Sequence, residues 1–158
     1  MLKLIPTHGH SPNILEICTL LIRYRELIFS ENQNPVGVFL ENLENNKIKV
    51  ISAFNNGEFM AFLVLYDFKE IAKGRFVCYI YGAAKRGFSG EIEHGFKVIF
   101  ESLKSQGCVS LRLETRKFNM PMRMLARRLG FRKVGILANA SILNNKFVDN
   151  ILYEKVFY

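Results

Sequence analysis

Hydrophobic residues recur in the first part of the chain with the period of a helix. After a weakly alternating segment from Leu2 to Ile5, which we interpret as a short strand, apolar side chains return at steps of three and four residues. Ser11 and Pro12 are the residue types of an N-cap and a first helical position. The pattern therefore predicts a helix over about residues 12–29, and Val38 to Leu43 indicates a second, short helix.

The next part of the chain has the pattern of three strands joined by turns. Lys47 to Phe54 alternates between apolar and polar positions, and Phe59 to Phe68 is an almost unbroken apolar run. Asn55 to Gly57 contains residues that tolerate positive φ, so these two segments read as a hairpin. Glu70 to Gly74 is a second turn, and Arg75 to Ala84 is a third, aromatic-rich strand. Together they predict an antiparallel meander.

The second half of the chain alternates helix and strand. Ser89 is a plausible N-cap for a helix that Gly107 ends. Its apolar face is formed by Ile92, Phe96, Ile99 and Leu103. Residues 109–115 alternate as a strand, and a strand, helix and strand in this order predict two parallel neighbours.

A short helix and a final hairpin complete the pattern. Asn119 is placed to cap the helix, and Gly130 to end it. Two strand-like segments, Lys133 to Leu143 and Phe147 to Phe157, flank the pair Asn144-Asn145, which favours a tight turn.

The element order β-α-α-β-β-β-α-β-α-β-β predicts an α+β fold. We expect a mixed, mainly antiparallel sheet of six or seven strands, flanked by helices on both faces. The chain has 158 residues, of which 49% are hydrophobic and 23% charged, and it contains no repeat or linker-like segment. We therefore expect one domain that covers residues 1–158.

The cysteines indicate neither disulfides nor a metal site. Cys18, Cys78 and Cys108 are odd in number and form no C-x-x-C pair or zinc-type cluster, and His8 and His10 have no further ligands nearby in the sequence. The apolar run at the N-terminus is too short for a signal peptide, and no segment approaches 18 apolar residues. We expect a cytoplasmic protein that binds no metal and does not enter a membrane.

The net charge of +8 lies entirely in the second half of the chain. Between Arg112 and Lys133 there are eight basic residues and one acid, Glu114. Such a run serves a polyanionic ligand, a nucleic acid or simply solubility. The sequence alone leaves these three interpretations open.

The loop from Lys85 to Gly90 is a candidate anion site. It is basic, contains glycine and leads from a strand into the first turn of a helix, where unpaired N–H groups favour phosphate. The alternative is an ordinary tight turn, because glycine-containing loops of this kind are common.

From Asn119 to Phe131 the sequence resembles a known family, the GNAT superfamily of N-acetyltransferases. The resemblance rests on the family pattern N-x-x-A-x-x-L-Y-x-x-L-G-F, whose spacing is kept by Asn119, Met122, Leu125, Leu129, Gly130 and Phe131. The order of the elements is similar over the whole chain, and the motifs cover about residues 76–135.

The resemblance implies a cleft that binds acetyl-CoA or another acyl-CoA between two parallel strands that separate. By position, the pantetheine edge is implied to include Tyr81, Gly82 and Ala83. The pyrophosphate loop is implied to be Arg86, Gly87, Phe88, Ser89 and Gly90, with Asn119 near the cofactor arm and Arg123 among the basic residues that hold the nucleotide phosphates. The loop departs from the family pattern, because with Arg86 first, Ser89 and Glu91 stand where glycines are expected.

A second departure concerns catalysis. The family tyrosine that commonly protonates the departing thiolate falls on Ala126. Substitute proton donors are Tyr81, Tyr153 and Cys78, and candidate bases for the amine are Glu114, Asp67 and His94. Of these we select Tyr81 and Glu114 as the catalytic pair.

Three functions follow as hypotheses. The first is an acyl-CoA-dependent N-acyltransferase, most simply an acetyltransferase, in which the amine of a small molecule or a protein attacks the thioester directly. The second is a GNAT-fold binding or structural protein without turnover. The third, which we favour least, is a nucleic-acid-binding module that uses the basic surface of residues 112–133.

Overall fold

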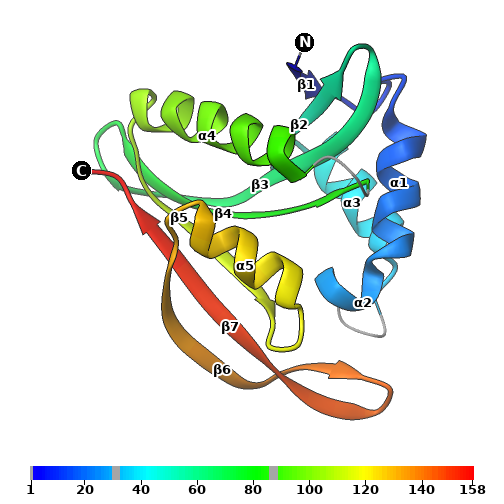
Figure 1. Ribbon diagram of the computed structural model, residues 1–158, viewed down its shortest axis with the longest axis vertical. Coiled ribbons are helices and arrows are strands. Elements are labelled where there is room, and N and C mark those ends of the chain that lie inside the picture. Colours follow the sequence, from blue (N-terminus) through cyan, green and yellow to red (C-terminus); the bar gives the residue numbers. More distant parts are fainter. Residues whose placement is uncertain (1, 30–32, 86–88) are drawn as a thin grey trace.

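The strand-like segments of the sequence pair into one seven-stranded sheet (Figure 1). The computed structural model describes residues 2–29, 33–85 and 89–158. The strands are β1 (Leu2–Thr7), β2 (Ile48–Asn55), β3 (Glu58–Ala72), β4 (Arg75–Ala84), β5 (Cys108–Arg116), β6 (Arg132–Leu143) and β7 (Lys146–Val156). They lie in the order β1-β2-β3-β4-β5-β7-β6, and only β4 and β5 are parallel. The predicted mixed, mainly antiparallel sheet is confirmed.

Helices cover both faces of this sheet (Figure 1). They are α1 (Ile14–Arg23), α2 (Arg25–Ile28), α3 (Pro35–Glu44), α4 (Ser89–Ser105) and α5 (Met120–Arg128). α1 and α3 pack on one face through Ile17, Leu21 and Phe39, while α4 and α5 pack on the other through Phe100 and Ala126. Because a strand turns alternate side chains to opposite faces, β3 supplies both cores.

The first predicted helix is shorter than its periodicity suggested. A single helix over about 12–29 is wrong, since α1 ends at Arg23 and the four-residue α2 follows Tyr24. The Ser11 cap is also wrong, because the N-cap residue is Asn13 and the Ser11 hydroxyl accepts the main-chain N–H of His8. The buried Asn13 amide instead donates to the Ser52 hydroxyl at 2.6 Å, a tertiary contact that moves the helix start.

Other boundaries differ by a few residues. β3 continues to Ala72, so the predicted turn at Glu70 to Gly74 is shorter and centres on Gly74, where φ is 70°. α4 begins at Ser89 itself, one residue before the predicted start.

The predicted end of α5 is confirmed in detail. Gly130, with φ of 82°, donates to the Arg127 carbonyl, and Phe131 donates to the Ala126 carbonyl. This is the Schellman arrangement, in which a left-handed residue satisfies the last helical carbonyls. Phe131 then enters the core against Phe100, so the local signal also orients α5 on the sheet.

Within the described parts of the chain, no helix is both long and apolar enough to cross a membrane.

The two asparagine caps allow a matched stability test. Asn119 accepts from Met122 N–H and donates to the buried Thr115 hydroxyl, whereas the exposed Asn34 accepts only from Gly37 N–H among the bonds seen at its side chain. Loss of a cap costs about 0.5–2 kcal/mol, so we expect Asn34→Ala and Asn119→Ala both to lower the free energy of unfolding. Asn119→Ala should cost more, because it also leaves the Thr115 hydroxyl without a partner. Urea denaturation measures both, and an equal loss in the two variants would contradict this account.

Candidate functional site

The two parallel strands separate part of the way along. Pairing between β4 and β5 runs from Phe76 and Cys108 to Ile80 and Leu113 and then stops. Beyond this point β4 stays paired with β3, and β5 stays paired with β7 through Arg116. Each strand is thus held by its outer neighbour, and a V-shaped opening forms between them.

The separation leaves a main-chain edge of β4 without a neighbouring strand. Lys85 N–H donates to the Met60 carbonyl at 2.7 Å, so the main-chain groups of Lys85 point towards β3. Since successive residues of a strand point their N–H and C=O groups to opposite edges, those of Gly82 and Ala84 point into the opening. An extended ligand with amide groups would find hydrogen-bond partners there.

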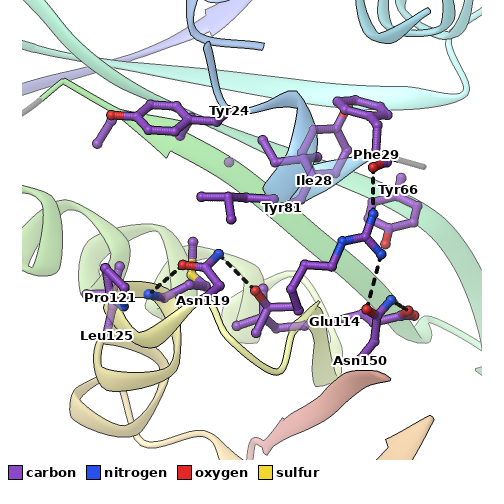
Figure 2. A pocket seen from close by; sticks show the side chains of 18 of the residues that line it. Tyr24, Ile28, Phe29, Tyr66, Tyr81, Glu114, Asn119, Pro121, Leu125 and Asn150 are labelled. Atoms are coloured by element: carbon purple, nitrogen blue, oxygen red, sulfur yellow. Dashed lines mark hydrogen bonds between the residues drawn. The ribbon is translucent and has the colours of Figure 1, made fainter. Parts of the chain in front are cut away.

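A cavity of about 880 Å³ occupies this opening. That volume lies in the range of small-molecule and cofactor sites, roughly 300–1,000 Å³. Its walls come mainly from α2 and α3, from β4 and β5 beyond their pairing, from the first turn of α4, from α5, and from the β6–β7 hairpin. Figure 2 shows the aromatic side chains of Tyr24, Phe29 and Tyr81 across the cavity from Asn119 and Leu125.

The structure brings five of the predicted site residues together at this cavity: Tyr81, Gly82, Ala83, Glu114 and Asn119. Gly90 is exposed and is not part of the wall, and Ser89 is the first residue of α4. Arg86, Gly87 and Phe88 lie outside the described residues.

Two of the predicted cofactor residues already have partners within the protein. The Arg123 guanidinium donates to the Lys117 carbonyl at 2.7 Å and does not line the cavity. The Asn119 side chain lines it, but its amide is engaged with Thr115 and with Met122 N–H. The hydrogen bonds of Arg123 and Asn119 thus stabilise the connection between β5 and α5.

Tyr81 lies against a second tyrosine that the sequence did not single out. Its ring contacts Tyr66 with 5.5 Å between centroids and Phe29 with 5.9 Å. Burial raises the pKa of both tyrosine hydroxyls above their ordinary value, and the Glu114 carboxylate raises the pKa of Tyr66 further. Both hydroxyls therefore stay protonated at neutral pH and can donate a hydrogen bond or a proton.

Glu114 belongs to a polar network on the α2 side of the sheet (Figure 2). Its carboxylate accepts from the Asn150 amide at 2.5 Å, and Asn150 also donates to the Ser141 hydroxyl at 2.9 Å. Among the described side chains, no cation lies within ion-pair distance of Glu114. The carboxylate is thus oriented by an amide rather than neutralised by a cation.

Arg116 fixes this network to α2. Its guanidinium is 3% exposed and donates to the carbonyls of Glu26 and Phe29 and to the Asn150 side chain. Burial lowers the pKa of the Arg116 guanidinium, and the nearby Glu114 carboxylate opposes this shift. The sequence placed Arg116 in a basic run, but the structure uses it as an internal tie between α2, β5 and β7.

The basic run of residues 112–133 does not stay together in space. Arg112 pairs with Glu154 at 3.1 Å, Lys117 with Asp149 at 3.4 Å, and Arg128 with Glu93 at 3.6 Å. A strand places Arg112 and Arg116 on the α2 side, whereas Arg128 lies on α5. The basic residues of the run are therefore close together in the sequence but do not form one continuous basic surface.

Two cations, Lys85 and Arg128, line the cavity near α4. Lys85 is ion-paired with Glu16 at 2.8 Å, and Arg128 with Glu93 at 3.6 Å. α4 begins beside them at Ser89. A helix start with neighbouring cations is suited to an anionic group.

Of the other candidate bases and proton donors, only one lies at the cavity. Asp67 lines the cavity, His94 is exposed on α4, and Cys78 and Tyr153 are buried in the core on the α4–α5 face. Tyr66 and Asn150 were missed as site residues, and Arg116 and Arg128 were considered only as members of the basic run, because polar residues within strands and helices carry no signal of the face they share. No group of three or more His, Cys, Asp or Glu side chains within residues 2–29, 33–85 and 89–158 is placed to hold a metal ion.

Comparison with solved structures identifies similar folds. No protein-family model matches the sequence, and no curated protein matches it significantly. RimL, a ribosomal alpha-N-protein acetyltransferase solved in complex with coenzyme A, aligns over 99% of this chain and 94% of its own, with 16% identity and a TM-score of 0.78. A ribosomal-protein-alanine N-acetyltransferase from Brucella melitensis aligns over 97% and 99%, with 15% identity and a TM-score of 0.77. An acetyltransferase of the GNAT family from Streptococcus pneumoniae aligns over 99% and 100%, with 16% identity and a TM-score of 0.72. At these identities the likeness establishes the fold.

Gly82 permits the close approach of β4 to β3 beside the opening. A Cβ atom at this position would lie 2.3 Å from the Phe62 carbonyl oxygen, which is main chain and cannot move aside cheaply. We expect Gly82→Ala to lower the free energy of unfolding by about 1–3 kcal/mol, as overpacking does. Gly135→Ala is the control, since a Cβ atom there meets nothing within 4 Å. Urea denaturation of both variants tests the contact, and a neutral Gly82→Ala would show that β4 can shift away.

Proposed function

From the GNAT fold of this chain and the geometry of its cleft, we propose that the protein is an acyl-CoA-dependent N-acyltransferase. The observation that carries the proposal is the opening between β4 and β5, which combines a free main-chain edge at Gly82 and Ala84 with a cation-lined helix start. These are the two features that a pantetheine arm and its phosphates require.

The residues present fit an acyl-CoA along the length of the cavity. Lys85, Arg128 and the start of α4 would hold the phosphates at one end. The main-chain groups of Gly82 and Ala84 would pair with the amides of the arm. The bound thioester supplies an activated acyl carbon, which would then lie between the wall residues Tyr81 and Glu114.

The α2 side of the cavity suits an amine acceptor. Two carboxylates, Asp67 and Glu114, line it, and neither has an ion-paired cation among the described side chains. Arg116 and Lys47 also line the cavity, so the carboxylates offer hydrogen-bond acceptors for an amine rather than a wall of net negative charge. A primary amine on a small molecule or a protein can donate to these acceptors.

Glu114 and Tyr81 divide the proton transfers. The amine reacts in its neutral form, after loss of one proton to solvent, and Glu114, held by Asn150, takes a second proton as the amine nitrogen bonds to the acyl carbon. The bond from carbon to sulfur breaks, and the Tyr81 hydroxyl, whose raised pKa keeps it neutral, gives its proton to the thiolate. Exchange with solvent restores both groups. Ala126 is buried in the core and takes no part in the proton transfers.

Calorimetry with acetyl-CoA tests the binding half of the proposal. We expect a sub-millimolar dissociation constant, and no binding at millimolar acetyl-CoA would remove the proposal. Arg128→Ala should weaken binding about three- to tenfold, through loss of a charge-assisted contact. Arg127→Ala is the matched control, because Arg127 is the preceding residue of α5, is exposed and does not line the cavity.

Turnover tests the catalytic half. In a screen of primary amines with release of free thiol as the readout, we expect Glu114→Gln to lower kcat by about 10²–10⁴, the contribution of a general base, with acetyl-CoA affinity unchanged. Binding without turnover by the wild type would instead identify a binding module.

A further inference from the structure

A small apolar recess opens beside the point where β4 and β5 separate. Its volume is about 20 Å³, and only apolar atoms face it. Five residues line both the recess and the main cavity: Tyr81, Gly82, Leu113, Met122 and Leu125. The recess therefore shares a wall with the cavity at the place that the proposed function assigns to the thioester.

The recess lies on the α4–α5 face, opposite the side from which the amine is proposed to enter. Its inner wall is formed by core side chains of that face, including Phe100, Ala126 and Phe131. Tyr81 packs against Phe29 on the α2 side, whereas Gly82 lines both the cavity and the recess. A Cβ atom at position 82 would meet the Phe62 carbonyl oxygen, so the glycine keeps β4 close to β3 beside the recess.

Ala126 is one of the smallest residues that line the recess. It is 1% exposed, and its single methyl group lies among three phenylalanines and several leucines. The volume is enough for one water molecule, which needs about 10–15 Å³, but a water there would find no polar partner. An apolar group of one carbon suits the space.

We propose that this recess accepts the terminal methyl of an acyl group one carbon longer than acetyl, so that the protein prefers propionyl-CoA to acetyl-CoA, with Ala126 as a specificity-determining residue. The inference rests on the proposed function. The acyl tail enters the α4–α5 face while the amine attacks from the α2 side, so the two do not compete for space.

Calorimetry with acetyl-, propionyl- and butyryl-CoA on the full chain tests the preference without knowledge of the acceptor. Burial of one additional CH₂ group predicts about fourfold tighter binding of propionyl-CoA than of acetyl-CoA. Ala126→Val fills the recess, so the ratio of propionyl-CoA to acetyl-CoA affinity should fall to about one or below. Ala138→Val on the exposed part of β6 is the control and should leave the ratio unchanged.

Ala126→Gly covers the case in which valine prevents folding. It removes one methyl group, so butyryl-CoA should gain affinity relative to acetyl-CoA. Equal wild-type affinity for acetyl- and propionyl-CoA, or the same ratio in the wild type and both Ala126 variants, would overturn the preference. Absence of binding by all three acyl-CoAs would overturn the proposed function itself, so the two failures are distinguishable.

Discussion

The main-chain pairing between β4 and β5 ends at Ile80 and Leu113, and the site depends on that ending. Two parallel strands would normally continue to pair, but here each is held on its other edge, β4 by β3 and β5 by β7. The unpaired edge at Gly82 therefore persists without collapse of the sheet. Ordinarily an unpaired main-chain edge inside a protein is costly, so its presence beside a cavity of about 880 Å³ indicates a place for a ligand that completes the hydrogen bonds.

The sheet separates the chemistry of the site into two sides. On the α2 side, aromatic rings and the carboxylates of Asp67 and Glu114 surround the proposed amine position. On the α4–α5 side, apolar core residues surround the recess beside Ala126. Side chains alternate along β4, so Tyr81 packs with Phe29 and Tyr66 on the first side, whereas Ile80 lines the recess on the second. In the proposed function, β4 therefore contributes a proton donor through Tyr81, a main-chain edge at Gly82 and one wall of the recess.

Arg116 holds α2 against the sheet through hydrogen bonds. A four-residue helix has almost no internal hydrogen bonds to stabilise it, and two carbonyls at its end accept from the Arg116 guanidinium. The same guanidinium donates to Asn150, which orients Glu114. A buried arginine without a carboxylate at ion-pair distance among the described residues is unusual, and the three oxygen acceptors compensate for its desolvation. The position of α2 beside the proposed amine site and the orientation of Glu114, the proposed base, are thus linked through the Arg116 side chain.

The order of the elements, the cap at Asn119 and the end of α5 at Gly130 are determined by the sequence itself, because each depends on residues within a few positions of one another. The parallel pair also follows from the sequence, because the helix between the two strands provides the crossover that parallel pairing requires. The GNAT-like spacing from Asn119 to Phe131 belongs to the same class of local signal. The break after Arg23, the start of α1 at Ile14 and the meeting of Tyr66, Arg116 and Asn150 were decided only by tertiary structure. These features depend on cross-strand register and on contacts such as Asn13 with Ser52, whose partners are far apart along the chain, so no local pattern contains them.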